Sequence, residues 1–183
     1  MSIRFSAAAV ALAALGGCAS QTHVHKAMHT PAFSPDTPPV SADMIGMDGS
    51  VIGSVSIVEG PNGVLGEVML QPGSMEPGFH GMHIHQVGDC SDVGVFTNSG
   101  GHLGLIPGGH GLMNSVGPET GDLPNLHVAQ DGSAAMEFFS NYFSISDLRD
   151  DDDAAMIIHQ NRDDHVSQPI GGSGPRIACA VLK

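Results

Sequence analysis

The sequence has no tryptophan and only six lysine and arginine residues among 183. Nineteen aspartate and glutamate residues outnumber these cations, so the formal net charge is −13 with histidine neutral. Phosphate binding needs clustered cations, and we therefore expect no nucleic-acid partner. The 25 glycines lie among short apolar runs, which favours a turn-rich β protein over a helical one.

The chain also lacks an apolar run long enough to be a permanent transmembrane helix. The apolar run at 7–15 follows Arg4, an arrangement typical of a signal peptide, which we assign to residues 1–17. Leu15-Gly16-Gly17-Cys18 resembles the bacterial lipobox, which implies that Cys18 is lipidated and becomes the mature N-terminus. A plain secretory signal with an incidental cysteine is the alternative. Removing residues 1–17 removes Arg4 and no acidic residue, so the net charge of −13 becomes −14.

Ala19 follows the cysteine and resembles the sorting signal for the bacterial outer membrane. We therefore expect a periplasmic protein that contacts the membrane only through its lipid. Residues 18–40 are rich in Ser, Thr, Pro and His, which predicts a lipidated, disordered tether. Its histidines and one methionine suggest metal capture, and a solvated linker with scattered histidines is the alternative; these residues are His23, His25, Met28 and His29.

Residues 41–183 form the predicted folded domain, in which short apolar runs alternate with turn signals such as Asp48-Gly49. The predicted strands are 42–47, 51–58, 64–70, 79–85, 127–130, 134–139, 154–159 and 176–182. Short strands at this spacing suggest an all-β sandwich or barrel. Residues 86–126 and 160–175 carry little strand character, and loops of such length are usually functional.

Cysteine is scarce, with only three residues in the chain. If Cys18 carries a lipid, Cys90 and Cys179 remain as a pair. An exported protein meets an oxidising environment, so we expect a disulfide between them, with two free buried thiols as the alternative.

Histidine, in contrast, is abundant, and eight of the eleven histidines lie between residues 80 and 165. His83 and His85 are two residues apart on a predicted strand and therefore point to the same face. Two neutral imidazoles on one face supply half of a transition-metal site.

Several further motifs accompany this pair in a fixed order and together resemble bacterial copper/zinc superoxide dismutase. The matching segments are 78–85 (GFHGMHIH), 88–90 (GDC), 100–102 (GGH), 110–111 (HG), 121–125 (GDLPN), His159 with Asp163-Asp164, and 174–179 (GPRIAC). The resemblance covers about residues 42–183. It implies an eight-stranded Greek-key β-barrel with long metal-binding and electrostatic loops, and dismutation of superoxide at a redox-cycling copper ion.

The resemblance also implies a role for each matching residue. The implied copper ligands are His83, His85, His102 and His159. His102 also bridges to zinc, and the other implied zinc ligands are His110 and Asp122. Arg176 guides the anionic substrate, and His102 carries a proton. Asp163 links a copper histidine to a zinc histidine, His80 joins loops without ligating, and Cys90 and Cys179 form the family disulfide.

One position departs from the family pattern. The remaining zinc ligand of the family is a histidine three residues before Asp122, and this chain has Glu119 there. Glutamate oxygen can bind zinc, so Glu119 is a candidate zinc ligand. A copper-only enzyme with weak or lost zinc binding is the alternative. We expect His127 to be a surface histidine and His165 to be solvated.

The domain has no lysine before Lys183 and only three arginines, namely Arg149, Arg162 and Arg176. We therefore expect attraction of superoxide to depend mainly on Arg176. A non-catalytic copper-binding or copper-delivery lipoprotein on the same fold is the first alternative function. A structural barrel with satisfied core histidines is the second. The sequence leaves open whether the chain is a monomer or a homodimer.

Overall fold

The computed structural model describes residue 34 and residues 36–183. The predicted signal peptide, Cys18, and the tether residues His23, His25, Met28 and His29 lie outside the described residues. The strands are β1 (Val40–Gly46), β2 (Val51–Gly60), β3 (Gly63–Leu70), β4 (Gly78–His80), β5 (Met82–His85), β6 (Leu126–Val128), β7 (Ala134–Ser140), β8 (Ala154–His159) and β9 (Arg176–Leu182). One 3-10 turn, η1 (Thr97–Ser99), and one short helix, α1 (Ile145–Leu148), complete the described elements.

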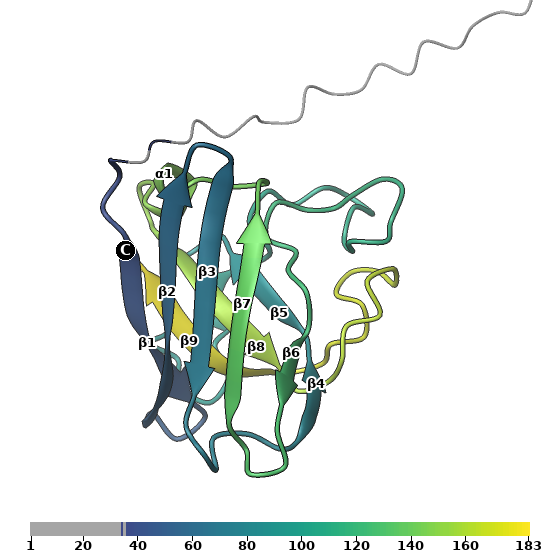
Figure 1. Ribbon diagram of the computed structural model, residues 1–183. Helices are drawn as coiled ribbons and strands as arrows, with labels where there is room; N and C mark the ends of the chain where they lie inside the picture. The colour runs from purple at the N-terminus through teal and green to yellow at the C-terminus, as the bar shows by residue number, and fades with distance from the viewer. Residues whose placement is uncertain (1–33, 35) are drawn as a thin grey trace, which may run out of the picture.

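The protein is nearly all β, as the turn-rich sequence predicts. Seven strands form one curled antiparallel sheet in the order β5-β8-β9-β1-β2-β3-β7, and β4 and β6 pair as a second, two-stranded sheet. In Figure 1 the large sheet curls so that β5 and β8 lie behind β3 and β7. This arrangement is that of a Greek-key barrel, which confirms the expected fold class. No helix of the described residues is long and apolar enough to span a membrane.

The predicted strand 79–85 divides in two, so the described residues form nine strands where the sequence suggested eight. β4 pairs with β6, whereas β5 pairs with β8. The chain changes partner at Gly81, whose amide donates to the carbonyl of Asn161 and whose carbonyl accepts from the amide of His159. A Cβ there would lie 2.5 Å from Oγ of Ser173, so only glycine fits at this crossing.

The core lies inside the curled sheet and follows the alternation of the strands. In β3, Val64, Val68 and Leu70 point inward, and Leu65 and Met69 point outward. β5 and β8 are buried along their whole lengths because they are covered on both faces. The side chains of β5 are therefore buried and excluded from solvent.

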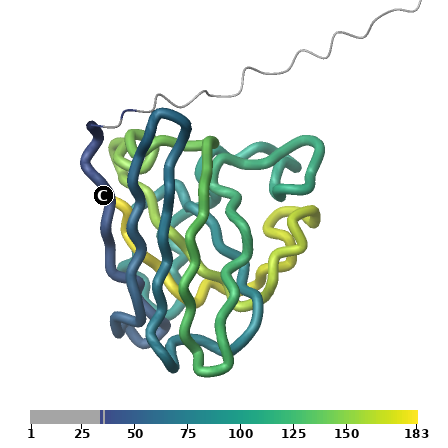
Figure 2. Tube along the Cα trace, viewed as in Figure 1, coloured from purple at the N-terminus to yellow at the C-terminus, as the bar shows by residue number. Residues whose placement is uncertain are grey.

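Two long loops lie on the same side of the barrel, one between β5 and β6 and one between β8 and β9 (Figure 2). Both were expected from the weak strand character of 86–126 and 160–175. Cys90 and Cys179 form the expected disulfide, with Cα atoms 5.9 Å apart. It ties the first loop to β9. In the chain-entropy treatment a closure of this length is worth on the order of 4 kcal/mol.

Candidate metal centre

Three of the candidate histidines stand on neighbouring strands. His83 and His85 lie on β5, and His159 ends β8, the strand that pairs with β5. The ring centroids of His83 and His159 are 4.8 Å apart, and those of His85 and His159 are 5.9 Å apart. The antiparallel pairing of β5 with β8 therefore brings His159 next to His83 and His85, so the three rings form one cluster.

The loop after β5 adds the fourth histidine, His102. Backbone hydrogen bonds hold this part of the loop against β5: the amide of Gln86 donates to Gly101, and the amide of Leu103 donates to Ile84. The ring centroid of His102 then lies 4.2 Å from that of His83. The four rings are between 0% and 3% exposed.

Each of these four histidines has one buried ring nitrogen without a hydrogen-bond partner. The atoms are Nδ1 of His83 and Nε2 of His85, His102 and His159. One nitrogen from each ring also lies within 4.8 Å of one from every other ring of the group. Buried polar atoms normally have partners, so four unpartnered lone pairs facing one another fit a bound metal ion.

The second nitrogen of three rings sets which tautomer is present. Nδ1–H of His85 donates to the carbonyl of Gly100 at 3.0 Å, and Nδ1–H of His159 donates to that of Gly174 at 2.9 Å. Nε2–H of His83 donates to Oδ2 of Asp163 at 2.7 Å. Each donation leaves the other nitrogen unprotonated and ready to ligate.

A second group of donors adjoins the first and shares His102 with it. Its members are His102, His110, Glu119 and Asp122, all buried. Oε2 of Glu119 lies 2.8 Å from Nδ1 of His102, and Oδ1 of Asp122 lies 2.8 Å from Nδ1 of His110. Nδ1 of His102 thus faces this group while Nε2 faces the first one. Two imidazoles and two carboxylates form a donor set suited to Zn²⁺.

Glu119 is held in this position by the backbone around it. Its Oε1 accepts from the amide of Ile106 at 3.0 Å, and its own amide donates to Oδ2 of Asp122 at 2.9 Å. The amide of Gly111 donates to the same Oδ2 at 2.7 Å. The two carboxylates are therefore positioned by fixed donors.

Asp163 connects the two groups from the second long loop. Oδ2 accepts from Nε2 of His83 at 2.7 Å, and Oδ1 accepts from Nε2 of His110 at 3.2 Å. Asn125 holds this aspartate by donating to its carbonyl and accepting from its amide. A ligand histidine is oriented by the partner of its other nitrogen, so one carboxylate orients a ring in each group.

Burial and hydrogen bonding shift the pKa values of these side chains in opposite directions. Burial lowers the pKa of His83 to about 4 and that of His159 to about 3. Burial also lowers the pKa of His85. His83, His85 and His159 are therefore held neutral at pH 7, which is the state that ligates a metal.

The second group behaves differently in the metal-free protein. Burial opposes charge on His110, but hydrogen bonds to Asp122 and Asp163 outweigh it and raise the pKa of His110 to about 10. Although burial alone would raise the carboxyl pKa values of Asp122 and Asp163, hydrogen bonds from the histidines hold both far below the usual range. A divalent ion at these atoms would displace the proton of His110.

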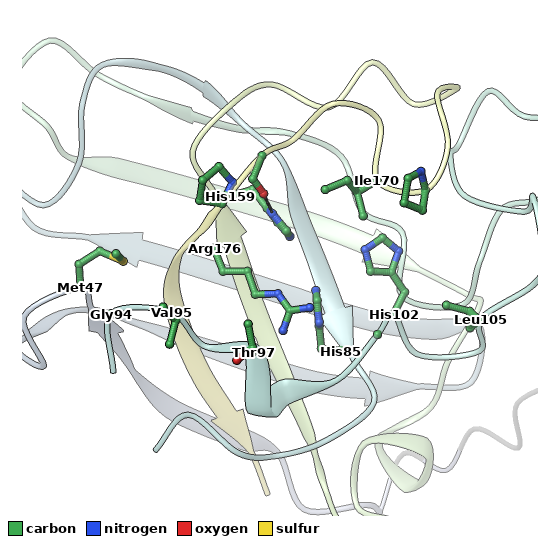
Figure 3. A pocket seen from close by; sticks show the side chains of 14 residues that line it. Met47, His85, Gly94, Val95, Thr97, His102, Leu105, His159, Ile170 and Arg176 are labelled. Carbon is green, nitrogen blue, oxygen red and sulfur yellow. Dashed lines mark hydrogen bonds between the residues drawn. The ribbon is translucent and has the colours of Figure 1, made fainter. Parts of the chain in front are cut away.

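Arg176, the first residue of β9, reaches into the pocket with its side chain between His159 and His85 (Figure 3). Its guanidinium donates to the carbonyl of Phe96 at 2.7 Å, to Oγ of Ser99 at 3.0 Å and to the carbonyl of Gly100 at 2.7 Å. The pocket has a volume of about 450 Å³ and is also lined by His85, His102 and His159. A fixed positive charge beside the first donor group is suited to docking a small anion.

The loop that supplies these acceptors is organised by Asp92. Its Oδ2 accepts from the amide of Thr97 at 2.7 Å, from Oγ1 of Thr97 at 2.7 Å and from the amide of Asn98 at 3.1 Å. Its backbone carbonyl accepts from the amides of Val95 and Phe96. Sequence reasoning did not select Asp92, and neither did it select the carbonyls of Gly100 and Gly174, because backbone acceptors carry no residue-type signal.

The remaining histidines lie outside the two donor groups. His80 is buried and bridges the carbonyls of His159 and Glu76 at 2.9 Å each, so it joins a loop to the barrel. His127 is exposed as expected and packs edge-on against Phe79. His165 is half-buried beside Asn125, with Nε2 2.9 Å from Nδ2 of the asparagine. His165 was expected to be solvated rather than ligating; it lies outside the donor groups, but its contact with Asn125 makes the ring less solvated than expected.

The comparisons with known proteins agree with this geometry. The model of the copper/zinc superoxide dismutase family matches residues 51–182. The chain is 39% identical to superoxide dismutase [Cu-Zn] of Caulobacter vibrioides, over 74% of this chain and 80% of that protein. It is 32% identical to superoxide dismutase [Cu-Zn] 1 of Aquifex aeolicus, over 78% of this chain and 86% of that one.

Among solved structures, the chain is similar to a SOD-like protein from Bacillus subtilis. The TM-score is 0.69 at 29% identity, and the match covers 83% of this chain and 100% of that one.

Proposed function

The chain belongs to the copper/zinc superoxide dismutase family and dismutates superoxide, and we propose that the first donor group holds its copper and the second its zinc. The copper ligands in this proposal are His83, His85, His102 and His159. The zinc ligands are His102, His110, Glu119 and Asp122. The observation that carries the proposal is the set of four unpartnered nitrogens facing one another in the core.

Glu119 supports a bound zinc rather than a copper-only enzyme. It is only 3% exposed, and its Oε2 belongs to a group of four donors that lie within 4.8 Å of one another. A buried carboxylate is costly unless it is well paired, and a zinc ion would add a cation to the donors that Glu119 already has from Ile106 and His102. With two carboxylates this site carries one more negative charge than the three-histidine site of the family.

The chemistry that a bound copper ion would supply is one-electron transfer between two superoxide anions. The chain supplies the docking charge for both anions. Arg176 stays protonated at neutral pH, and its three hydrogen bonds fix the guanidinium at the pocket. Its position beside His85 and His159 brings the anion to the donor group.

His102 supplies the proton-holding atom. It lines the pocket, and its Nε2 has no other hydrogen-bond partner. When Nε2 carries a proton, it can pass that proton to a reduced anion docked at Arg176. Nδ1 of the same ring faces Glu119 and Asp122, so the orientation of the ring is kept while Nε2 gains and loses the proton.

Superoxide turnover by the copper-loaded protein tests the assignment against a non-catalytic copper-binding or copper-delivery lipoprotein. The anchored guanidinium of Arg176 favours catalysis, since a copper store needs no anion dock. We expect rapid turnover in the wild type and loss of turnover in His159→Ala with an unchanged circular dichroism spectrum. A fully metallated wild type without turnover would contradict the proposal.

Residues 1–40, most of which lie outside the described part of the chain, bear on location. We propose that residues 1–17 direct export, that Cys18 carries the lipid, and that residues 18–40 tether the domain of 41–183 to the outer membrane. The lipobox-like segment ending at Cys18 supports this. Cys18→Ser should release the protein from the membrane fraction and abolish labelling by radioactive palmitate; labelling that persists would contradict it.

The histidines of the tether form a separate hypothesis, in which the segment captures copper when copper is scarce. Deleting residues 19–30 removes His23, His25 and His29. Metal loading at limiting copper should then slow, whereas unchanged loading kinetics would contradict the hypothesis.

A further inference from the structure

Met47 lies at the rim of the copper pocket, in the turn between β1 and β2. It lines the same pocket as His85, His159 and Arg176, and its side chain is 47% exposed. In Figure 3 the thioether end of Met47 points to the side of the pocket where Arg176 and His159 lie. The side chain is therefore open to solvent and directed to the donor group.

Few other groups at the rim can ligate a metal. The lining residues other than the three histidines, Met47 and Arg176 are Gly94, Val95, Thr97, Gly101, Leu105, Pro169, Ile170, Gly174 and Pro175. These are apolar or glycine, apart from the hydroxyl of Thr97, which hydrogen-bonds to Asp92. Met47 provides the one sulfur donor among the residues that line the pocket.

Arg176 makes the route of a copper ion difficult. The guanidinium that attracts an anion repels Cu⁺ or Cu²⁺ on the way to the buried imidazoles. A carboxylate at the rim would attract the cation but would also repel superoxide. A thioether is neutral, so it can bind copper without changing the field that an anion meets.

Thioether sulfur is also a soft ligand and prefers Cu(I) to Cu(II). We propose that Met47 is a capture ligand for Cu(I), which binds the ion at the pocket mouth before it passes to His85 and His159. This proposal rests on the proposed copper site. A single flexible thioether holds the ion weakly. The ion then passes to the four-histidine copper site because that site offers more ligands.

The test compares Met47→Leu with Met69→Leu in the full-length, copper-free protein. Leucine conserves volume and removes only the sulfur. Met69 is a matched control, because it is 43% exposed but lies on the outer face of β3 and does not line the pocket. Copper is supplied as its Cu(I) complex with bathocuproine disulfonate, and uptake is followed by the loss of the absorbance of that complex.

We expect Met47→Leu to slow Cu(I) uptake about five-fold, the equivalent of about 1 kcal/mol. Met69→Leu should load at the wild-type rate, and both variants should reach the wild-type copper content. Cu(II) uptake should be the same in all three proteins.

Equal Cu(I) uptake by Met47→Leu and Met69→Leu would overturn the proposal. If Met47→Leu slowed the uptake of Cu(II) as much as that of Cu(I), the proposal would also be overturned, because the effect would not depend on a soft sulfur ligand. Failure of the four-histidine site itself has a different signature, since the wild type would then not reach one tightly bound copper per chain.

Discussion

Oε2 of Glu119 lies 2.8 Å from Nδ1 of His102. At position 119 the family resemblance implies a zinc-binding histidine instead of this glutamate. The imidazole of His102 turns its Nε2 to the copper donors. The negative charge of Glu119 is therefore one ring away from the proposed copper site. Glu119 is therefore the zinc-site donor at which this chain differs from the pattern that the family resemblance implies.

Replacing Glu119 should separate zinc binding from copper binding. We expect Glu119→Gln to weaken zinc roughly 10- to 100-fold, because a charged ligand is replaced by a neutral one. Glu119→His should retain zinc and raise the copper reduction potential, since one negative charge near His102 is lost. Elemental analysis and potentiometry measure the two effects. Full zinc content in Glu119→Gln at limiting zinc would show that Glu119 is not a ligand.

Arg176→Ala should remove most of the dependence of the rate on ionic strength. Electrostatic attraction at a cleft raises association by roughly ten-fold or more at low salt, and the described rim has no other cation. Arg162→Ala is the control, because it deletes the same charge from a side chain stacked on Phe79 outside the pocket. Pulse radiolysis at several salt concentrations measures the slope. An unchanged slope in Arg176→Ala would contradict a steering role.

Asp92→Ala should loosen the loop that anchors Arg176. Loss of three hydrogen bonds to Thr97 and Asn98 should lower the free energy of unfolding by at least about 1 kcal/mol, since one hydrogen bond contributes roughly 0.5–1.5 kcal/mol net. It should also lower the rate at low ionic strength, because the acceptors of Arg176 become mobile. Asp89→Ala is the control in the same loop, since Oδ1 of Asp89 accepts from the amide of Ser91 and not from the amides of Thr97 and Asn98.

Urea unfolding and the salt dependence of turnover measure both effects of Asp92→Ala. Asp92→Asn keeps an acceptor oxygen, so its free energy of unfolding and its salt dependence of turnover should be closer to those of the wild type than the values of Asp92→Ala are. A variant with lower stability but a normal salt slope would assign Asp92 to folding alone.

Gly171→Ala should disturb both metal sites from the second long loop. A Cβ at Gly171 would lie 1.7 Å from Oδ1 of Asp163 and 2.9 Å from Nε2 of His110. Displacing Asp163 should weaken metal binding roughly 10- to 100-fold. Gly172→Ala is the control, because Gly172 also has a positive φ but a Cβ there meets nothing within 4 Å. Competition with chelators measures metal affinity, and equal affinities would show that Asp163 tolerates displacement.

The metal-free protein should lose stability on both sides of pH 6.5. His83 has a pKa of about 4 when folded and 6.5 ordinarily, so its unfolded form binds more protons below pH 6.5. Its contribution is complete above pH 6.5 and is lost as pH falls to about 4. His159 has a pKa of about 3 when folded, so its contribution to stability is lost as pH falls from 6.5 to about 3.

His110 acts in the opposite direction. Its pKa is raised to about 10, so its contribution is complete below pH 6.5 and is lost as pH rises to about 10. Urea unfolding of the metal-free protein across this range measures both limbs, and His110→Asn should flatten the alkaline limb. A stability that stays constant from pH 6.5 to 10 would contradict the raised pKa.

The candidate metal ligands could be selected from the sequence because their chemistry depends on residue type. His83 and His85 share a face by the alternation of a strand, and the motifs around His102, His110, Asp122 and His159 recur in a known order. The disulfide could be expected from the cysteine count, and a β sandwich or barrel from short apolar runs between turn signals. These features are local, or they follow from residue identity.

The partners of those residues could not be predicted in the same way. The division of 79–85 at Gly81 follows from two long-range hydrogen bonds, and the burial of His165 follows from its contact with Asn125. The carbonyls of Gly100 and Gly174 orient His85 and His159, yet every residue has a carbonyl, so no pattern marks them.

The sequence by itself determined the donor types, the family resemblance and the presence of Glu119 where that resemblance implies a histidine, because these features depend on residue identity alone. Only the tertiary structure decided which nitrogen of each ring is free, how Asp163 joins the two groups, and that Asp92 and Met47 belong to the surroundings of the pocket. The reason is that these relations depend on distances between segments far apart in the chain, which are set by packing of the whole barrel and its loops.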